Sequence, residues 1–228
     1  MTRQRKSGEQ PSKARKPNNS YFLKKGMKLI VMTRPTFFVE EDKILTILFE
    51  EGLESLHLFK PGEEPVFSER LLSLIPEDYY RRITVHSHFY LREEYSLRGI
   101  HLEQPEAQLP YGYKGSVSRT CTTLEQAAQW KKPSSYIFLK SIFNSQSNPA
   151  DRQSFSIDEL KAASKRGIID RHVYALGGVN IDNIQLLADL GFGGVVVCGD
   201  LWNRFNIHTG QDFSELISHF KKLQKAVS

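Results

Sequence analysis

Residues 173–199 read VYALGGVNIDNIQLLADLGFGGVVVCG and predict a strand, a helix and a second strand. The two apolar runs, 173–176 and 195–198, lack the alternation of polar and apolar residues that marks a half-exposed strand. Such strands are buried on both faces, as in a parallel sheet covered by helices. The segment between them has apolar residues at helical spacing and two candidate N-caps: Ile184, Leu187 and Leu190, with Asn180 or Asp182.

Each of these two predicted strands stops at glycine, the first at Gly177-Gly178 and the second at Gly199. Because glycine has no side chain, backbone amides there can approach a ligand closely. A helix that begins beside them adds the positive end of its dipole, so the glycines predict a phosphate site. The alternative is that they only form tight turns between strand and helix.

The composition is that of one ordinary globular domain, with 228 residues, 39% of them hydrophobic and 25% charged. The sequence contains neither an apolar run long enough to cross a membrane nor the core of a signal peptide. Its two cysteines, Cys121 and Cys198, do not form a metal or redox motif. A reduced, cytoplasmic protein is therefore expected.

The positive charge is concentrated at the N-terminus. The whole chain carries +5, whereas residues 1–27 hold eight Lys or Arg against Glu9 alone, a net +7 that leaves −2 for the remainder. Residues 1–26 predict a disordered basic tail, and an inert extension is favoured over a weak polyanion binder. The domain of residues 27–228 has no basic face, so neither nucleic acid nor a membrane is an expected partner.

Strand-like and helix-like segments alternate along the domain. Strands are predicted at 28–33, 55–60, 82–86, 99–102, 116–119, 136–140, 173–176 and 195–198. Helices are predicted at 40–51, 68–74 with Ser68 as N-cap, 89–97, 123–130, 157–166, after 178 and at 213–226. The alternation predicts a parallel sheet. Eight units in about 200 residues predict a single-domain α/β fold, a closed (β/α)8 or TIM barrel, with a doubly wound open sheet as the alternative.

In such a barrel, active groups lie at the C-terminal ends of the strands, and phosphate sites commonly follow strands seven and eight. The two glycine stops fall at those positions, which favours the phosphate site over simple turns. The other chemically capable residues at strand ends are Thr33, Arg34, His57, Lys60, His86, His88, Glu103, Glu106, Ser118, Arg119, Thr120, Lys140 and Ser141.

Three of the seven histidines, His57, His86 and His88, gather on the neighbouring strands two and three. Imidazole exchanges protons near neutral pH, so the rings are candidates for proton transfer or for orienting a substrate. A metal ion would need a third ligand of suitable geometry, for which His57 or Glu106 is the candidate. Ordinary hydrogen-bonded or exposed histidines are the plain alternative.

From about residue 28 to residue 202 the chain resembles the thiamine phosphate synthase family, which includes the thiazole tautomerases. The resemblance rests on the order and spacing of four motifs, GIHLEQ (99–104), SVSRT (116–120), ALGGVN (175–180) and GVVVCGDLW (194–202). It implies a (β/α)8 barrel. It also implies that the phosphate of a thiazole phosphate is held by Gly177, Gly178, Cys198 and Gly199, and that Ser118 falls on a serine of the family's fifth strand.

The resemblance further implies the reaction of the family's synthases, which join a pyrimidine diphosphate to a thiazole phosphate while magnesium assists the departure of diphosphate. The chain departs from the family in the diphosphate half of the site. His57, Phe59 and Pro61 stand where the family has Gln, Arg and Lys. His86-Ser87 replaces Asn-Asp, Asn148 replaces a lysine, and only Glu106 remains as a magnesium ligand. Cations that could compensate are Arg34, Lys60, Arg119 and Lys140.

The sequence therefore predicts an enzyme of this family that acts on a thiazole phosphate or a similar small phosphorylated heterocycle. Proton transfer of the tautomerase kind, with His57, His86, His88, Ser118 and Glu106 as catalytic candidates, is favoured over a synthase with a rebuilt diphosphate site. A third hypothesis is a non-catalytic barrel that binds a phosphorylated metabolite. Lys60, Arg119, Thr120 and Lys140 are further substrate-site candidates. No cofactor is predicted apart from magnesium in the synthase case, and a homo-oligomer is left open.

Overall fold

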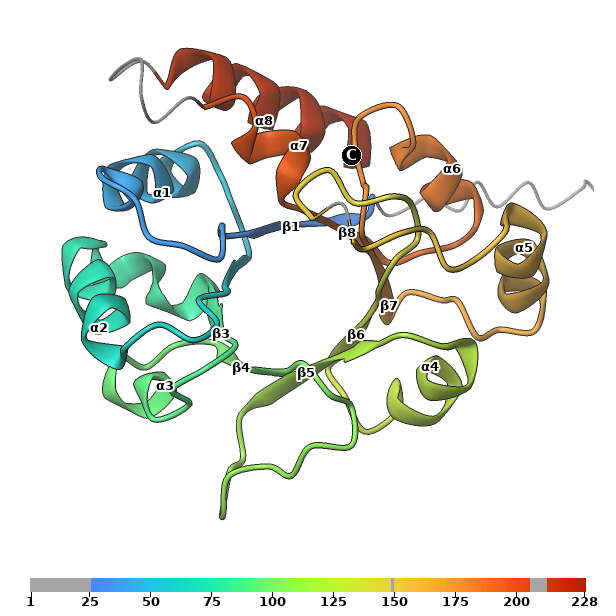
Figure 1. Cartoon of the computed structure of the whole chain (residues 1–228), viewed down its shortest axis with the longest axis horizontal. Coiled ribbons are helices and arrows are strands. Elements are labelled where there is room, and N and C mark those ends of the chain that lie inside the picture. Colours follow the sequence, from blue (N-terminus) through green and yellow to red (C-terminus); the bar gives the residue numbers. More distant parts are fainter. Residues whose placement is uncertain (1–25, 149, 206–212) are drawn as a thin grey trace, which may run out of the picture.

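The computed structural model describes residues 26–148, 150–205 and 213–228, so nearly all of the tail predicted at 1–26 lies outside the described residues. Eight strands form one closed parallel barrel in chain order (Figure 1). They are β1 (Lys28–Met32), β2 (Leu56–Leu58), β3 (Ile83–Val85), β4 (Gly99–Leu102), β5 (Ser116–Cys121), β6 (Tyr136–Leu139), β7 (Val173–Leu176) and β8 (Gly194–Val197). The ring closes through β1 and β8, where Val31 pairs with Val197. This confirms the (β/α)8 barrel and excludes the open sheet.

The helices surround the ring of strands (Figure 1). They are α1 (Glu41–Glu50), α2 (Pro65–Leu74), α3 (Leu91–Glu94), α4 (Leu124–Trp130), α5 (Ile157–Lys165), α6 (Ile184–Asp189), α7 (Gly199–Trp202) and α8 (Ser214–Val227), with a 3₁₀ segment η1 (Glu77–Arg82) before β3. None of the described helices is long and apolar enough to cross a membrane.

Two helix starts differ from the prediction. Ser68 is not the N-cap of α2, because the helix already begins at Pro65, whose fixed φ suits the first helical position. The N-cap of α6 is Asn183 rather than Asn180 or Asp182. Asn180 Oδ1 instead accepts hydrogen bonds from the amides of Asp182 and Asn183, which makes a turn ahead of the helix. The segment predicted as a helix at 89–97 is helical only over α3.

The interior of the barrel is divided between apolar and polar side chains. One side holds a small apolar cluster of Ile30, Met32, Phe138 and Val196, separate from the main core between strands and helices. On the other side, β2 to β5 direct polar side chains inward: His57, His101, Ser118 and Thr120, all buried. Buried polar groups must be hydrogen-bonded to be stable, so this half of the interior forms a bonded network.

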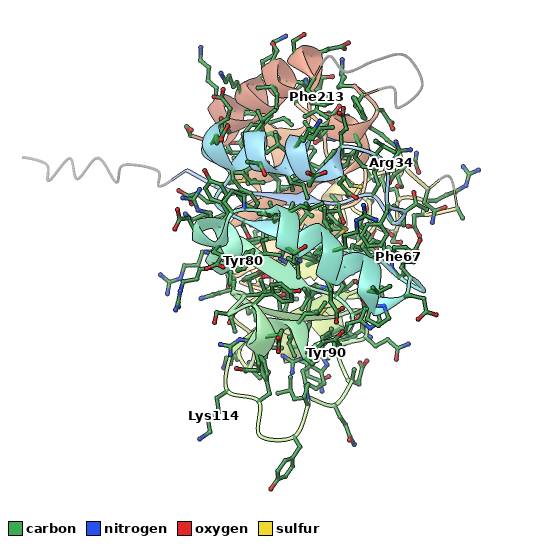
Figure 2. The ribbon with its side chains drawn as sticks, turned by 90° about the vertical axis from the view of Figure 1, so that its left-hand side faces the viewer. Arg34, Phe67, Tyr80, Tyr90, Lys114 and Phe213 are labelled. Atoms are coloured by element: carbon green, nitrogen blue, oxygen red, sulfur yellow. The ribbon has the colours of Figure 1, made fainter. Side chains whose placement is uncertain are left out.

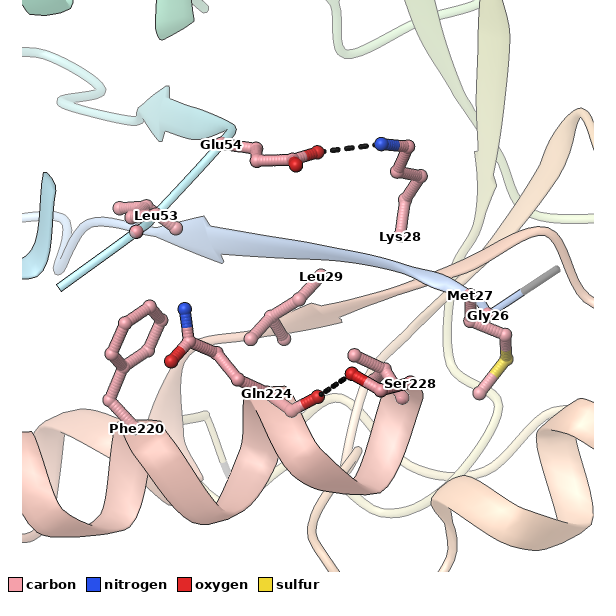
Figure 3. A pocket seen from close by; sticks show the side chains of 11 residues that line it. Gly26, Met27, Lys28, Leu29, Leu53, Glu54, Phe220, Gln224 and Ser228 are labelled. Atoms are coloured by element: carbon pink, nitrogen blue, oxygen red, sulfur yellow. Dashed lines mark hydrogen bonds and ion pairs between the residues drawn. The ribbon is translucent and has the colours of Figure 1, made fainter.

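The N-terminal end of the barrel carries a surface cavity of about 350 Å³ between β1 and α8 (Figure 3). Lys28 Nζ lies 2.6 Å from a carboxylate oxygen of Glu54, and the amide of Met27 donates to the carbonyl oxygen of Val227 at 2.8 Å. These contacts join the start of β1 to its neighbours at the bottom of the barrel. Active groups of such barrels lie at the opposite end, where Arg34 follows β1 on the right in Figure 2.

Candidate active site

A pocket of about 230 Å³, called here the mouth pocket, opens at the C-terminal ends of the strands. Its wall comes from the ends of β1, β6, β7 and β8, from Phe59 after β2 and Glu103 after β4, and from the loop after β6, which is drawn in yellow near β8 in Figure 1. The lining includes Glu103, Lys140, Gly177, Gly178, Cys198 and Gly199. The structure therefore brings the four residues predicted to bind phosphate into one pocket with Lys140.

The glycines after β7 adopt backbone angles that other residues rarely take, with φ of 101° at Gly177 and 65° at Gly178. A Cβ atom at Gly177 would lie 3.0 Å from the Cα of Ser141, and one at Gly178 would meet the carbonyl oxygen of Asn144. The amide of Phe143 donates to the carbonyl oxygen of Gly177 at 3.0 Å. The missing side chains therefore let the loop after β6 pack directly on the end of β7.

The backbone amides of Gly177, Gly178 and Gly199 donate no hydrogen bond to any residue that the structure describes. All three residues line the mouth pocket. An amide without a protein partner at the wall of a pocket needs an acceptor from solvent or from a ligand. Several such amides close together are a common way to bind an anionic oxygen.

The side chains near these amides supply one compensated cation, Lys140, and the nearby Arg34, whose charge acts to lower the pKa of Cys198 against the larger effect of burial. Lys140 Nζ lies 3.3 Å from a carboxylate oxygen of Asp151, which offsets its charge. Burial raises the pKa of Cys198 to about 11, so its sulfur is a neutral thiol at pH 7, placed 3.7 Å from the carbonyl oxygen of Thr33. Asp200 is paired with His219 at 2.6 Å. Among the described residues that line this end of the pocket, the donors without a protein partner are therefore backbone amides.

A chain of four hydrogen-bonded side chains runs from the barrel interior to the mouth pocket. The oxygen of Tyr136 lies 2.7 Å from His57 Nε2, and His57 Nδ1 lies 2.8 Å from His86 Nε2. His86 Nδ1 is 2.5 Å from Glu103 Oε1. With Glu103 ionised, one arrangement of protons satisfies all three contacts. The Tyr136 hydroxyl donates to His57 Nε2, His57 Nδ1–H donates to His86 Nε2, and His86 Nδ1–H donates to Glu103. We call Tyr136–His57–His86–Glu103 the relay chain.

The middle of the relay chain is buried, Glu103 at one end opens to the mouth pocket, and Tyr136 at the other end is half-buried and lines a separate cavity at the N-terminal ends of the strands. His57 is fully buried, and burial together with the nearby His86 lowers its pKa well below the usual 6.5, so the ring is neutral at pH 7. Burial also raises the pKa of Tyr136, which keeps its hydroxyl protonated. The side chain of Glu103 is 46% exposed and lines the pocket. Glu103 is therefore the member of the chain that can touch a ligand in the mouth pocket.

A third imidazole, His101 on β4, completes the cluster. Its Nδ1 lies 2.8 Å from Ser118 Oγ and its Nε2 lies 2.8 Å from Thr120 Oγ1. The ring stacks on His86 with centroids 4.2 Å apart. Ser118 and Thr120, both candidates from the sequence, thus hold His101 in place.

His88, the third histidine singled out in the sequence, lies outside this cluster. Its Nε2 is 2.9 Å from the carbonyl oxygen of Glu63, and its backbone has φ of 51°. Sequence reasoning did not single out His101 or Tyr136. A signal for His101 was present, because residues 101 and 103 of GIHLEQ point to the same side of a strand.

Comparison with known proteins gives the relationship of the chain. The family model described as thiamine monophosphate synthase matches residues 70–201. The chain belongs to the thiamine monophosphate synthase family. No match is found among curated proteins.

Solved structures agree with this family. The crystal structure of thiamine phosphate pyrophosphorylase from Bacteroides thetaiotaomicron is 50% identical, with a TM-score of 0.79, and the match covers 88% of this chain and 97% of that one. The thiamine phosphate pyrophosphorylase from Pyrococcus furiosus is 17% identical, with a TM-score of 0.68 over 90% and 97% of the two chains. The 3-hexulose-6-phosphate synthase from Salmonella typhimurium, 11% identical with a TM-score of 0.62 over 88% and 98%, shares the fold.

In this member of the thiamine monophosphate synthase family, two of the cations that could replace the missing cations of the diphosphate site are held by other residues. Lys60 is buried and lies 2.7 Å from a carboxylate oxygen of Glu41. Arg119 donates to the carbonyl oxygen of Pro105 at 3.0 Å and to Ser134 Oγ at 2.9 Å. Neither side chain is part of the wall of the mouth pocket.

Magnesium, the metal of the family's synthases, finds few free oxygen ligands among the described residues. At the two positions where the family has acidic magnesium ligands, this chain has Ser87 and Glu106. Glu106 is exposed, accepts a hydrogen bond from Gln126 at 3.2 Å and does not line the pocket. The carboxylates that do line the pocket already bond a histidine or a lysine: Glu103, Asp151 and Asp200. Magnesium prefers several oxygen ligands in near-octahedral geometry, so these residues do not fit a magnesium ion.

Proposed function

We propose that the chain binds a small phosphorylated heterocycle, a thiazole phosphate or a close relative, in the mouth pocket and moves a proton between a carbon of that ligand and solvent. The observation that carries this proposal is the relay chain, which ends at Glu103 in the wall of the pocket. A carboxylate that a histidine holds in place at a binding pocket is suited to accept and return a proton.

The phosphate end of the ligand belongs at the other side of the pocket. The amides of Gly177, Gly178 and Gly199 supply donors without fixed charge. This arrangement suits one phosphate group. It offers no cluster of cations for the higher charge of a diphosphate.

The proton step uses Glu103 as the catalytic residue and the rest of the relay chain for positioning. Glu103 takes a proton from a carbon of the bound heterocycle, and the resulting carboxylic acid returns it, or one exchanged with solvent, to the ligand. The His86 N–H fixes the carboxylate and stabilises its charge. His57 and Tyr136 hold His86 in the tautomer that donates toward Glu103.

A synthase is the second candidate, because the 50% identical structure from Bacteroides thetaiotaomicron is named a thiamine phosphate pyrophosphorylase. The residues that line the mouth pocket argue against a synthase. Phe59 and Asn148 occupy family positions for cations, and both line the pocket. Lys140 is the one Lys or Arg among the lining residues, and it is paired with Asp151. Departure of diphosphate needs more positive charge than one compensated lysine supplies.

One assay with two arms separates these functions. In the first arm the protein receives both synthase substrates with magnesium, and diphosphate is followed. In the second arm it receives thiazole phosphate in D₂O, and deuterium at carbon is read by mass spectrometry. We expect little or no diphosphate and an exchange rate above that without protein. His86→Ala should lower the exchange.

Two results would overturn the proposal. Release of diphosphate at an ordinary turnover of about 0.1–10 per second, unchanged by His57→Ala or His86→Ala, would restore the synthase. Tight binding of thiazole phosphate with neither diphosphate release nor exchange would leave a binding protein without catalysis.

Gly177→Val is expected to abolish binding of thiazole phosphate. Valine disfavours the left-handed backbone of residue 177, and its Cβ would meet Ser141 at 3.0 Å, so the loop must leave the pocket wall. Isothermal titration calorimetry measures the loss. The matched control is Gly167→Val, which has φ of 69° and no atom within 4 Å of its Cβ, so it carries the same kind of strain far from the pocket. Equal affinity in both variants would contradict the glycine site.

A further inference from the structure

Three buried imidazoles converge inside the barrel from neighbouring strands. His57 lies on β2, His86 directly after β3 and His101 on β4. One ring nitrogen of each lies within 4.8 Å of the corresponding nitrogens of the other two, the one such group of possible metal ligands among the described residues.

Each ring also has a hydrogen-bond partner on its outward nitrogen. His57 Nε2 faces the Tyr136 hydroxyl, and His86 Nδ1 faces the carboxylate of Glu103. His101 has a hydroxyl on each of its two nitrogens, from Ser118 and Thr120, so a bound metal displaces one of them and the other remains as the outer partner. Histidines that bind metals almost always carry such an outer partner, which fixes the ring and its tautomer.

We propose that His57, His86 and His101 form a binding site for a divalent transition-metal ion of the zinc class. Three imidazoles without thiolates suit zinc, copper, iron or nickel ions and do not suit magnesium or calcium.

Small adjustments of the rings produce the required geometry. Zinc–nitrogen bonds of about 2.0–2.1 Å in a tetrahedron place the nitrogens about 3.3–3.4 Å apart. His57 Nδ1 and His86 Nε2, now 2.8 Å apart, separate by about 0.5 Å to reach this value, and the most distant pair, within 4.8 Å, closes by at most about 1.5 Å. Three protein ligands leave one coordination position for water or for a further side chain.

The metal and the proton shared by His57 and His86 exclude each other, because both use His57 Nδ1 and His86 Nε2. With metal bound, His57 carries its proton on Nε2 and donates to Tyr136, while His86 Nδ1 still donates to Glu103. The site is thus separate from the mouth pocket but linked to it through the Glu103 contact. Its occupancy does not depend on which function the pocket has.

Cobalt(II) and zinc(II) added as the metal alone test the site without any substrate. The full-length protein is freed of metal with a chelator and, because the site is buried, is refolded with one equivalent of Co²⁺. We expect one Co²⁺ per chain with the visible absorption of a four-coordinate nitrogen site. A hundredfold excess of Zn²⁺ over its Kd should raise Tm by about 5–10 °C.

Variants assign the ligands. His101→Gln and His86→Gln should each weaken metal binding by more than about 100-fold, since even the loss of an outer partner costs 10–100-fold. The control is His172→Ala, which removes a partly exposed histidine outside the barrel interior. Circular dichroism of the metal-free proteins checks that each variant folds. If neither cluster variant folds, the wild-type Co²⁺ spectrum decides alone. Absence of that spectrum, or unchanged affinity in the folded cluster variants, overturns the proposal.

Discussion

Replacing Glu103 by glutamine is expected to lower the rate of deuterium exchange into bound thiazole phosphate by about 10²–10⁴-fold, the usual contribution of a positioned acid–base group. The amide keeps the size of the side chain and a hydrogen-bond acceptor 2.5 Å from His86 Nδ1, but it cannot hold the transferred proton. The affinity for the ligand should change little, because the proposed phosphate site lies at the glycine amides on the other side of the pocket.

Glu106→Gln is the matched control for this experiment. Glu106 is a neighbouring glutamate of the same segment, but it is exposed, contacts Gln126 and does not line the mouth pocket. Its exchange rate should equal that of the wild type. If Glu103→Gln exchanges deuterium as fast as Glu106→Gln, the relay chain does not end at the catalytic group and the proposed proton step is wrong.

Acid is expected to destabilise the barrel through its buried imidazoles. Burial depresses the pKa of His57 and of His101 in the folded protein, whereas the unfolded chain binds protons at these rings below about pH 6.5. The unfolded state then holds more protons, so stability is lost as the pH falls from 6.5 toward the folded pKa values. Each histidine lowers the free energy of unfolding by about 1.4 kcal/mol per pH unit in that range, or about 2.7 kcal/mol for both.

Denaturant unfolding between pH 7.5 and 5, with chelator present, measures this effect. Other groups titrate in the same range, among them Glu41, whose pKa burial raises and whose contribution has the opposite sign. The informative quantity is therefore the difference between wild type and His101→Gln. The variant should show a slope shallower by about 1.4 kcal/mol per pH unit. Identical slopes would mean that His101 is protonated in the folded protein.

The strands were predictable from the sequence because an unbroken apolar run indicates a strand that is buried on both faces. β4 and β7 begin and end at the predicted residues, since an apolar run bounded by glycine or a polar turn marks a buried parallel strand. Helix starts were less predictable. At α2 the prediction chose Ser68 as a cap, and the constraint that decided was Pro65 at the first helical position.

The site was predictable only in part, because its contacts join strands far apart in the chain. The glycine stops marked one wall of the pocket from local sequence alone. The contact between His57 and Tyr136 spans 79 residues, and no local pattern predicts it. Lys60 shows the converse: a lysine at a strand end fits a substrate site by position, yet buried Glu41 binds it 2.7 Å away.

The closing pair of the barrel also sets an order of events during synthesis. Val31 and Val197 pair directly although 166 positions separate them, so β1 must wait for β8 before the ring can close. At 5–20 residues per second, a ribosome needs about 8–33 s to make the intervening chain. Gly199 follows β8, so the wall of the mouth pocket that we propose to bind phosphate is finished only when the last strand has docked. A nascent chain therefore cannot bind its ligand before the fold is almost complete, and binding reports that assembly has ended.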